Sequence, residues 1–105
     1  MSEEHIVSEV KLLEEDDVRP ELPPADFDFL VYSLRLQAEM SLGLLPSSGK
    51  ARPDLEAAGH NIDLLAMLAA KTKGNLTDDE QRSLDQSLME LRFRFVQVKD
   101  SLAKE

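Results

Sequence analysis

The amino-acid sequence predicts an all-α protein, a three-helix antiparallel bundle with a long C-terminal helix and a disordered acidic N-terminal tail. Two observations predict this fold. Apolar residues recur at helical spacing in three segments, and turn-forming residues cluster between those segments. We therefore expect two parts in the 105-residue chain: an acidic tail at 1–25 that ends in prolines, and a three-helix domain at 26–105.

The tail holds most of the negative charge. Residues 1–25 contain eight acidic and two basic residues, a net charge of −6, against −9 for the whole chain. Prolines at 20, 23 and 24 favour an extended linker. Two interpretations stay open: the tail is a solubilising extension, or it is an acidic and hydrophobic docking segment that folds on a partner.

The first helix is expected from Asp26, a plausible N-cap, to about Gly43, before Leu44-Leu45-Pro46. The residues that should face the core are Phe27, Leu30, Val31, Leu34, Ala38 and Leu42. The opposite side of the same helix is also apolar, with Phe29, Leu36 and Met40. Only a narrow strip is expected to face solvent, with Asp28, Arg35 and Glu39.

The second helix is expected to begin near Pro53, where a proline is tolerated in the first turn, and to be closed by Gly74. Its main apolar stripe consists of Leu55, Ala58, Gly59, Ile62, Leu65, Ala66 and Ala69. Leu64 and Leu68 extend the apolar sector to the other side of this helix. Short connections on both sides should set neighbouring helices antiparallel.

The third helix is the longest, and its start has a clear signature. Thr77 and Glu80 form a capping-box pattern in which each side chain can bond to the other residue's backbone N–H. One seam should close the bundle, with Leu84, Leu88, Leu91, Phe95, Val98 and Leu102. A second apolar set lies roughly 120° to 180° away at 100° per residue, with Met89, Phe93 and Val96.

Apolar second faces on all three helices predict association, because a small monomer would expose too much apolar surface. We expect an antiparallel homodimer, or a role as an interaction or adaptor subunit that meets a different protein. The candidate interaction residues are Met89, Phe93, Val96, Arg92, Phe29, Leu36, Met40, Leu64 and Leu68. For Phe93 and its flanking arginines, an interface anchor competes with a simpler hypothesis, a surface ion pair between Arg94 and Glu90.

Several functional classes find no support in the sequence. The chain has no cysteine, which excludes disulfides, thiolate metal sites and cysteine nucleophiles. It has no basic cluster, so no nucleic-acid partner is expected. No apolar run approaches the roughly 18 residues of a membrane span, and the acidic N-terminus is unlike a signal peptide. We therefore expect a cytoplasmic protein without a membrane partner.

No residues form a catalytic pattern either, so we expect neither an enzyme nor a cofactor, a metal or a small-molecule substrate. The serines lack a nucleophile-elbow context, and the four glycines do not cluster into a phosphate-binding loop. The alternative hypothesis is a small-ligand or metal-binding protein that uses the polar strip around His60 and Asp63.

Three blocks of sequence resemble a known family. They comprise Phe29–Leu34, Leu42–Leu44 and Pro46; Ile62–Leu68, Lys71–Thr77 and Glu80; and Glu90–Val96. The chain is similar over about residues 27–97 to domain-of-unknown-function family 1844, a family of small, all-helical bacterial proteins. The resemblance implies a wholly helical fold preceded by a variable acidic tail. It implies no activity, cofactor or catalytic residue.

Overall fold

The computed structural model describes residues 21–46 and 52–105. Most of the expected tail, residues 1–20, and most of the loop after the first helix, residues 47–51, lie outside the described residues. The described part contains three helices and no strand, which confirms the all-α prediction.

Helix α2 spans Phe27–Ser41. The Asp26 carboxylate accepts a hydrogen bond from the backbone N–H of Phe29 at 2.8 Å, so the predicted cap is confirmed. The helix ends two residues before the predicted Gly43. That glycine has φ 75°, and its N–H donates to Met40 O while the N–H of Leu44 donates to Glu39 O, both at 3.0 Å. This Schellman motif ends α2.

Helix α3 spans Leu55–Lys71. The helix begins two residues after Pro53, near which its start was predicted, but the proline precedes the first turn. Asp54 is the N-cap, and its carboxylate accepts a hydrogen bond from the backbone N–H of Ala57 at 3.0 Å. The side-chain cap fixes the helix start after the proline. Gly74 has the predicted left-handed conformation, with φ 87°. It does not close the helix as predicted, because α3 ends at Lys71 with Thr72 as its C-cap, whose N–H donates to Leu68 O, and Gly74 lies in the turn that follows.

Helix α4 spans Asp78–Ala103 and begins with the predicted capping box. The N–H of Thr77 donates to Glu80 Oε1 at 2.8 Å, and the N–H of Glu80 donates to Thr77 Oγ1 at 3.1 Å. These bonds satisfy two N–H groups that the helix itself leaves unpaired.

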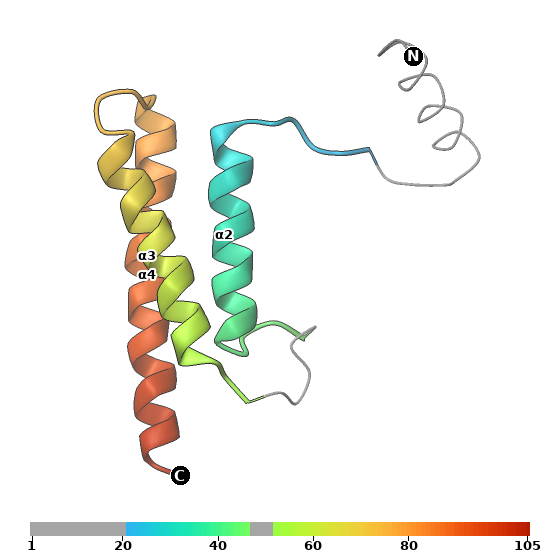
Figure 1. Cartoon of the computed structure of the whole chain (residues 1–105), viewed down its shortest axis with the longest axis vertical. Coiled ribbons are helices and arrows are strands. Elements are labelled where there is room, and N and C mark those ends of the chain that lie inside the picture. Colours follow the sequence, from blue (N-terminus) through green and yellow to red (C-terminus); the bar gives the residue numbers. More distant parts are fainter. Residues whose placement is uncertain (1–20, 47–51) are drawn as a thin grey trace, which may run out of the picture.

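The three helices lie side by side as an antiparallel bundle (Figure 1). Helix α3 runs opposite to α2, and α4 returns alongside both. The 15, 17 and 26 residues of α2, α3 and α4 give lengths of roughly 23, 26 and 39 Å. The C-terminal end of α4 therefore extends past the other two helices, as the sequence predicted.

The buried core comes from all three helices, and its hydrophobic residues are Val31, Ala38, Leu42, Ala58, Ile62, Leu65, Leu84, Leu88 and Leu91. The C-terminal half of the α4 seam is only half-buried, with Phe95, Val98 and Leu102. One predicted core residue is wrong: Leu30 is 43% exposed. It lies roughly 90° from the centre of the buried stripe, so it falls at the edge of the bundle.

Candidate interaction surface on helix α4

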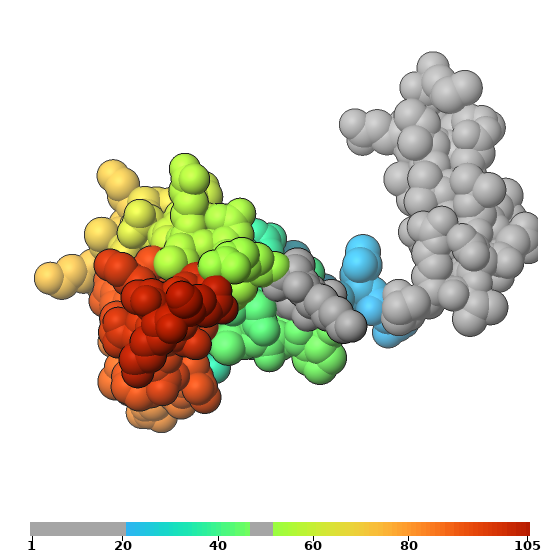
Figure 2. Space-filling model, turned by 90° about the horizontal axis from the view of Figure 1, so that it is seen from below, coloured from blue at the N-terminus to red at the C-terminus, as the bar shows by residue number. Residues whose placement is uncertain are grey.

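The side of α4 that faces away from the core carries three exposed apolar side chains, Met89, Phe93 and Val96. We call these three residues the outer α4 face. Their exposed fractions are 66%, 62% and 54%. Seen from below, α4 forms one corner of the bundle, with its free side turned away from α2 and α3 (Figure 2). Three neighbouring apolar residues on one helix face form a surface suited to contact.

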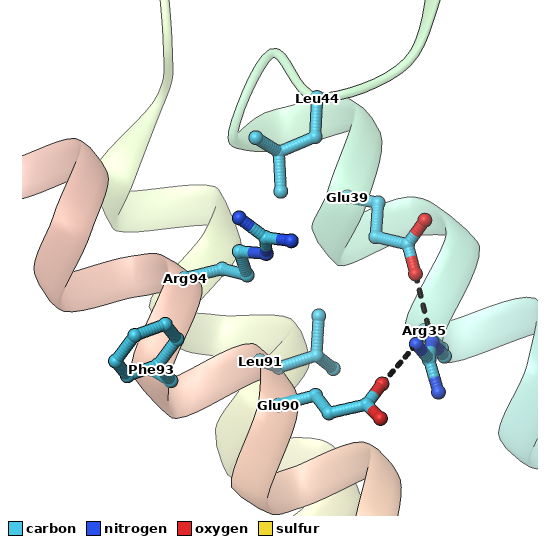
Figure 3. Close-up of a pocket in the computed structure, with 7 residues that line it drawn as sticks. All are labelled: Arg35, Glu39, Leu44, Glu90, Leu91, Phe93 and Arg94. Carbon is cyan, nitrogen blue, oxygen red and sulfur yellow. Dashed lines mark hydrogen bonds and ion pairs between the residues drawn. The ribbon is translucent and has the colours of Figure 1, made fainter.

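Of the hollows beside the outer α4 face, the first lies between α4 and α2 (Figure 3). It has a volume of about 630 Å³. Its lining residues are Arg35, Glu39, Leu44, Glu90, Leu91, Phe93 and Arg94. Arg94 extends into the space between the two helices, while Phe93 lies at the outer edge. This hollow combines charged side chains with an apolar rim.

The second hollow, between α4 and α3, is smaller and more apolar. Its volume is about 270 Å³, and it is lined by Gly59, Ile62, Asp63, Arg92, Phe95 and Val96. Gly59 lies beside the Phe95 ring, and a Cβ there would make an ordinary van der Waals contact of 3.8 Å with Cε2 of Phe95. The outer α4 face is thus a ridge with a hollow on each side.

Arg35 links α2 to α4 next to the first hollow. Its guanidinium donates to Glu39 Oε1 at 2.8 Å, to Ser87 Oγ at 3.3 Å and to Glu90 Oε2. The prediction that Arg35 and Glu39 simply face solvent is therefore wrong: both are half-buried, because they lie beside α4. An arginine fork can hold two carboxylates from different helices.

The predicted ion pair between Arg94 and Glu90 is replaced by other contacts. Glu90 binds Arg35 through one oxygen, and its other oxygen accepts from Gln86 Nε2 at 3.1 Å. Arg94 donates to Gln97 Oε1 at 3.1 Å. Glu90 pairs with Arg35 of the neighbouring helix because the packing of α2 on α4 holds Arg35 close to it.

These contacts shift the pKa values of both partners. The hydrogen bond from Gln86, followed by the hydrogen bond and charge of Arg35, lowers the pKa of the Glu90 carboxyl below its ordinary value of 4.5. The hydrogen bond to Glu39, together with the Glu90 contact, raises the pKa of Arg35. Both shifts favour the charged pair in the folded protein.

We expect this network to make stability depend on acid pH. A carboxyl whose pKa is lower in the folded than in the unfolded chain stabilises the fold above its unfolded pKa. That stabilisation is lost as pH falls below about 4.5 and through the lower pKa of the folded state. In urea unfolding at a series of pH values, Glu90→Gln should therefore lose less stability on acidification than the unchanged protein.

A second variant, Arg35→Gln, removes the same contact from the α2 side and should reduce the loss of stability on acidification in the same way. If both variants followed the unchanged curve at every pH, the Arg35 network would not contribute to acid sensitivity.

The remaining predicted interaction residues do not join the outer α4 face. Phe29 and Met40 are 40% and 45% exposed on the far side of α2, and Leu36 is half-buried. Leu64 and Leu68 of α3 are half-buried as well. None of these five lines either hollow beside the outer α4 face. Of the nine candidates, the structure brings together Met89, Arg92, Phe93 and Val96.

His60 is exposed on α3, and Asp63 lines the smaller hollow. Within residues 21–46 and 52–105, no group of three or more His, Cys, Asp or Glu side chains is placed to hold a metal ion. The same residues contain no helix long and apolar enough to cross a membrane.

The sequence did not predict the burial of two polar residues, Ser87 and Asn61. Ser87 is 3% exposed and receives the Arg35 hydrogen bond, and Asn61 Nδ2 donates to Ala57 O at 3.1 Å. The position of Ser87, one turn after Leu84 on the core seam, was a usable signal, because a serine there must find a partner.

Comparison with known families gives a match over most of the chain. The model of a family described as "Domain of unknown function (DUF1844)" matches residues 24–97, which include all of α2 and α3 and most of α4. Curated protein sequences and solved structures give no significant match. The matched range contains the whole outer α4 face.

Proposed function

Because this chain belongs to the DUF1844 family, whose description states no activity, we propose its function from its own surface: it is a non-catalytic, cytoplasmic protein that forms a homodimer through the outer α4 face. The observation that carries the proposal is the exposure of Met89, Phe93 and Val96, each more than half exposed, on one side of a 26-residue helix.

Burial of this face supports association in energetic terms. Full burial of a Met, Val or Phe side chain yields about 1.5–3 kcal/mol each, although these side chains are already partly covered. In a two-fold dimer every contact occurs twice, so six side chains contribute. This gain can exceed the cost of bringing two chains together and give a dimer of modest affinity.

Phe93 is the natural anchor of such an interface. Aromatic and arginine residues dominate binding energy at protein interfaces, and Phe93 has Arg92 and Arg94 on either side. Arg92 lines the hollow beside α3 and Arg94 the hollow beside α2, so polar groups flank an apolar centre. An apolar core with a polar rim is the common arrangement of protein interfaces.

Methyl NMR of the full chain on dilution tests the proposal. The sequence has four methionines, and Met89 lies on the outer α4 face while Met67 is exposed on α3. The Met89 methyl signal should move between concentrated and dilute samples as the dimer dissociates. The Met67 signal should stay in place. A Met89 signal that is independent of concentration over about 1 µM to 1 mM would contradict the proposal.

A further inference from the structure

On the basis of the proposed dimer, we propose that α4 pairs with α4 of a second copy in one antiparallel register, in which Arg82 of each copy contacts the partner's Asp100. The proposal rests on the self-association proposed above and adds the direction and the register of the pair.

The outer side of α4 has the spacing of a coiled-coil seam. Successive steps of four, three, four, three and four residues connect Arg82, Gln86, Met89, Phe93, Val96 and Asp100. At 100° per residue these six residues fall within a sector of roughly 80°. All six are exposed. This continuous stripe opposite the buried seam provides a contact surface on which a second helix can pack, either parallel or antiparallel.

An antiparallel register brings chemically matched residues of this stripe together. When Phe93 packs against the partner's Met89, Val96 lies opposite the partner's Gln86, and Asp100 lies opposite the partner's Arg82. Two-fold symmetry repeats each of these contacts. Met89 and Phe93 thus fill the centre, Val96 packs beside them against Gln86, and opposite charges meet at both ends.

Other arrangements match these residues less well. A parallel pair in register would place Arg82 beside the partner's Arg82 and Asp100 beside the partner's Asp100, so like charges would repel. An antiparallel pair shifted by one heptad would place Phe93 against the partner's Arg82, or Met89 against the partner's Asp100. Each shift moves a charge into the apolar centre, which is unfavourable.

Charged residues beside the stripe also face one another in this register. Asp85 approaches the partner's Lys99 on one flank, twice in the dimer. Arg92 lies near the two-fold axis on that flank, where the partner's Arg92 opposes it. On the other flank Glu90 also lies near the axis, but Arg35 of its own chain binds it. The repeated opposite-charge contacts outweigh the single arginine pair.

In the isolated chain, Arg82 has only a weak competing contact. Its Nη1 lies 3.5 Å from Asp79 Oδ1, and both side chains are largely exposed. Asp100 lies eighteen residues after Arg82, which places it roughly 27 Å farther along the same helix. The two residues therefore cannot interact within one copy, and any coupling between them requires a second copy.

This separation makes charge reversal a sharp test in the full chain. Arg82→Glu and Asp100→Lys should each raise the dimer dissociation constant about fivefold at low salt, because each reverses two contacts across the dimer. The double variant restores opposite charges and should return to within about twofold of the unchanged chain. Sedimentation velocity over a concentration series measures all four proteins.

Both single substitutions leave the helix well formed, since they place a negative charge near the N-terminus of α4 and a positive charge near its C-terminus. Circular dichroism checks the helicity. The absence of cysteine permits a second measurement: a single nitroxide at Ser101→Cys should give an inter-label separation of roughly 30 Å for this register. A parallel pair would give about 15 Å or less.

Weakening by both single variants with recovery in the double variant supports the register. If the single reversals leave the dissociation constant unchanged, or if the double variant does not restore it, the register is overturned. The proposed dimer itself would still stand. A chain that stays folded and monomeric overturns both the register and the proposed dimer. The outer α4 face would then be a surface for a different protein.

Discussion

Replacement of Phe93 with glutamate is expected to convert the dimer into a monomer that keeps its helices. In the isolated chain this side chain is 62% exposed, so a carboxylate there meets water and does not disturb the core. In the dimer the same carboxylate would be buried against the partner's apolar face, once in each copy. We expect the dissociation constant to rise about 100-fold or more, measured by sedimentation velocity.

The matched control is Met67→Glu. Met67 is an apolar residue that is 44% exposed on α3, away from the outer α4 face. The same replacement of an apolar side chain by a carboxylate at this position should leave both the dimer and the helical circular dichroism unchanged. Equal dissociation by both variants would mean that negative charge in general, and not loss of the outer α4 face, separates the subunits.

Leu84→Ala is expected to have the largest effect on folding. Leu84 is fully buried between the helices, and truncation of such a leucine costs about 2–5 kcal/mol because a cavity remains. A domain of this size has a total stability of only about 4–12 kcal/mol. Thermal unfolding should therefore show a melting temperature lower by about 10 °C or more.

Leu30→Ala makes the same chemical change at a position that is 43% exposed. It should cost about 1 kcal/mol or less, because the Leu30 side chain fills no enclosed space. The pair also tests the position of Leu30, which the sequence placed in the core and the structure places at its edge. Comparable losses for the two variants would contradict the packing described above.

The local features of this fold could be predicted from sequence because their determinants lie within a few residues. The Thr77 and Glu80 capping box, the Asp26 cap and the left-handed Gly74 each depend on groups one turn apart or less. The core seam of α4 was predictable for the same reason, since its period alone places Leu84 and Leu88 on one side.

Contacts between helices could not be predicted in this way. Arg35 and Glu90 are 55 residues apart, and their contact depends on how α2 is rotated against α4. Local spacing favoured an ion pair between Glu90 and Arg94, but Glu90 pairs with Arg35 instead. The exposure of Leu30 depends on the same rotation, because a change of some tens of degrees would turn it into the core.

The candidate surface was predictable in part. The sequence placed Met89, Phe93 and Val96 opposite the core seam, and their exposed positions agree with that placement. The two hollows that flank them depend on the separation of α4 from α2 and α3, which periodicity does not determine. The far side of α2, with Phe29 and Met40, faces another direction and forms a separate surface.

The mass of the full chain in solution is the most direct test of association through α4. Light scattering on fractions from about 1 µM to 1 mM reports this mass without any label or substitution. One chain has a mass of 11.8 kDa, so the dimer predicts about 24 kDa, twice that value, at the upper concentrations. A well-folded species that stays at 11.8 kDa across the whole range would contradict it.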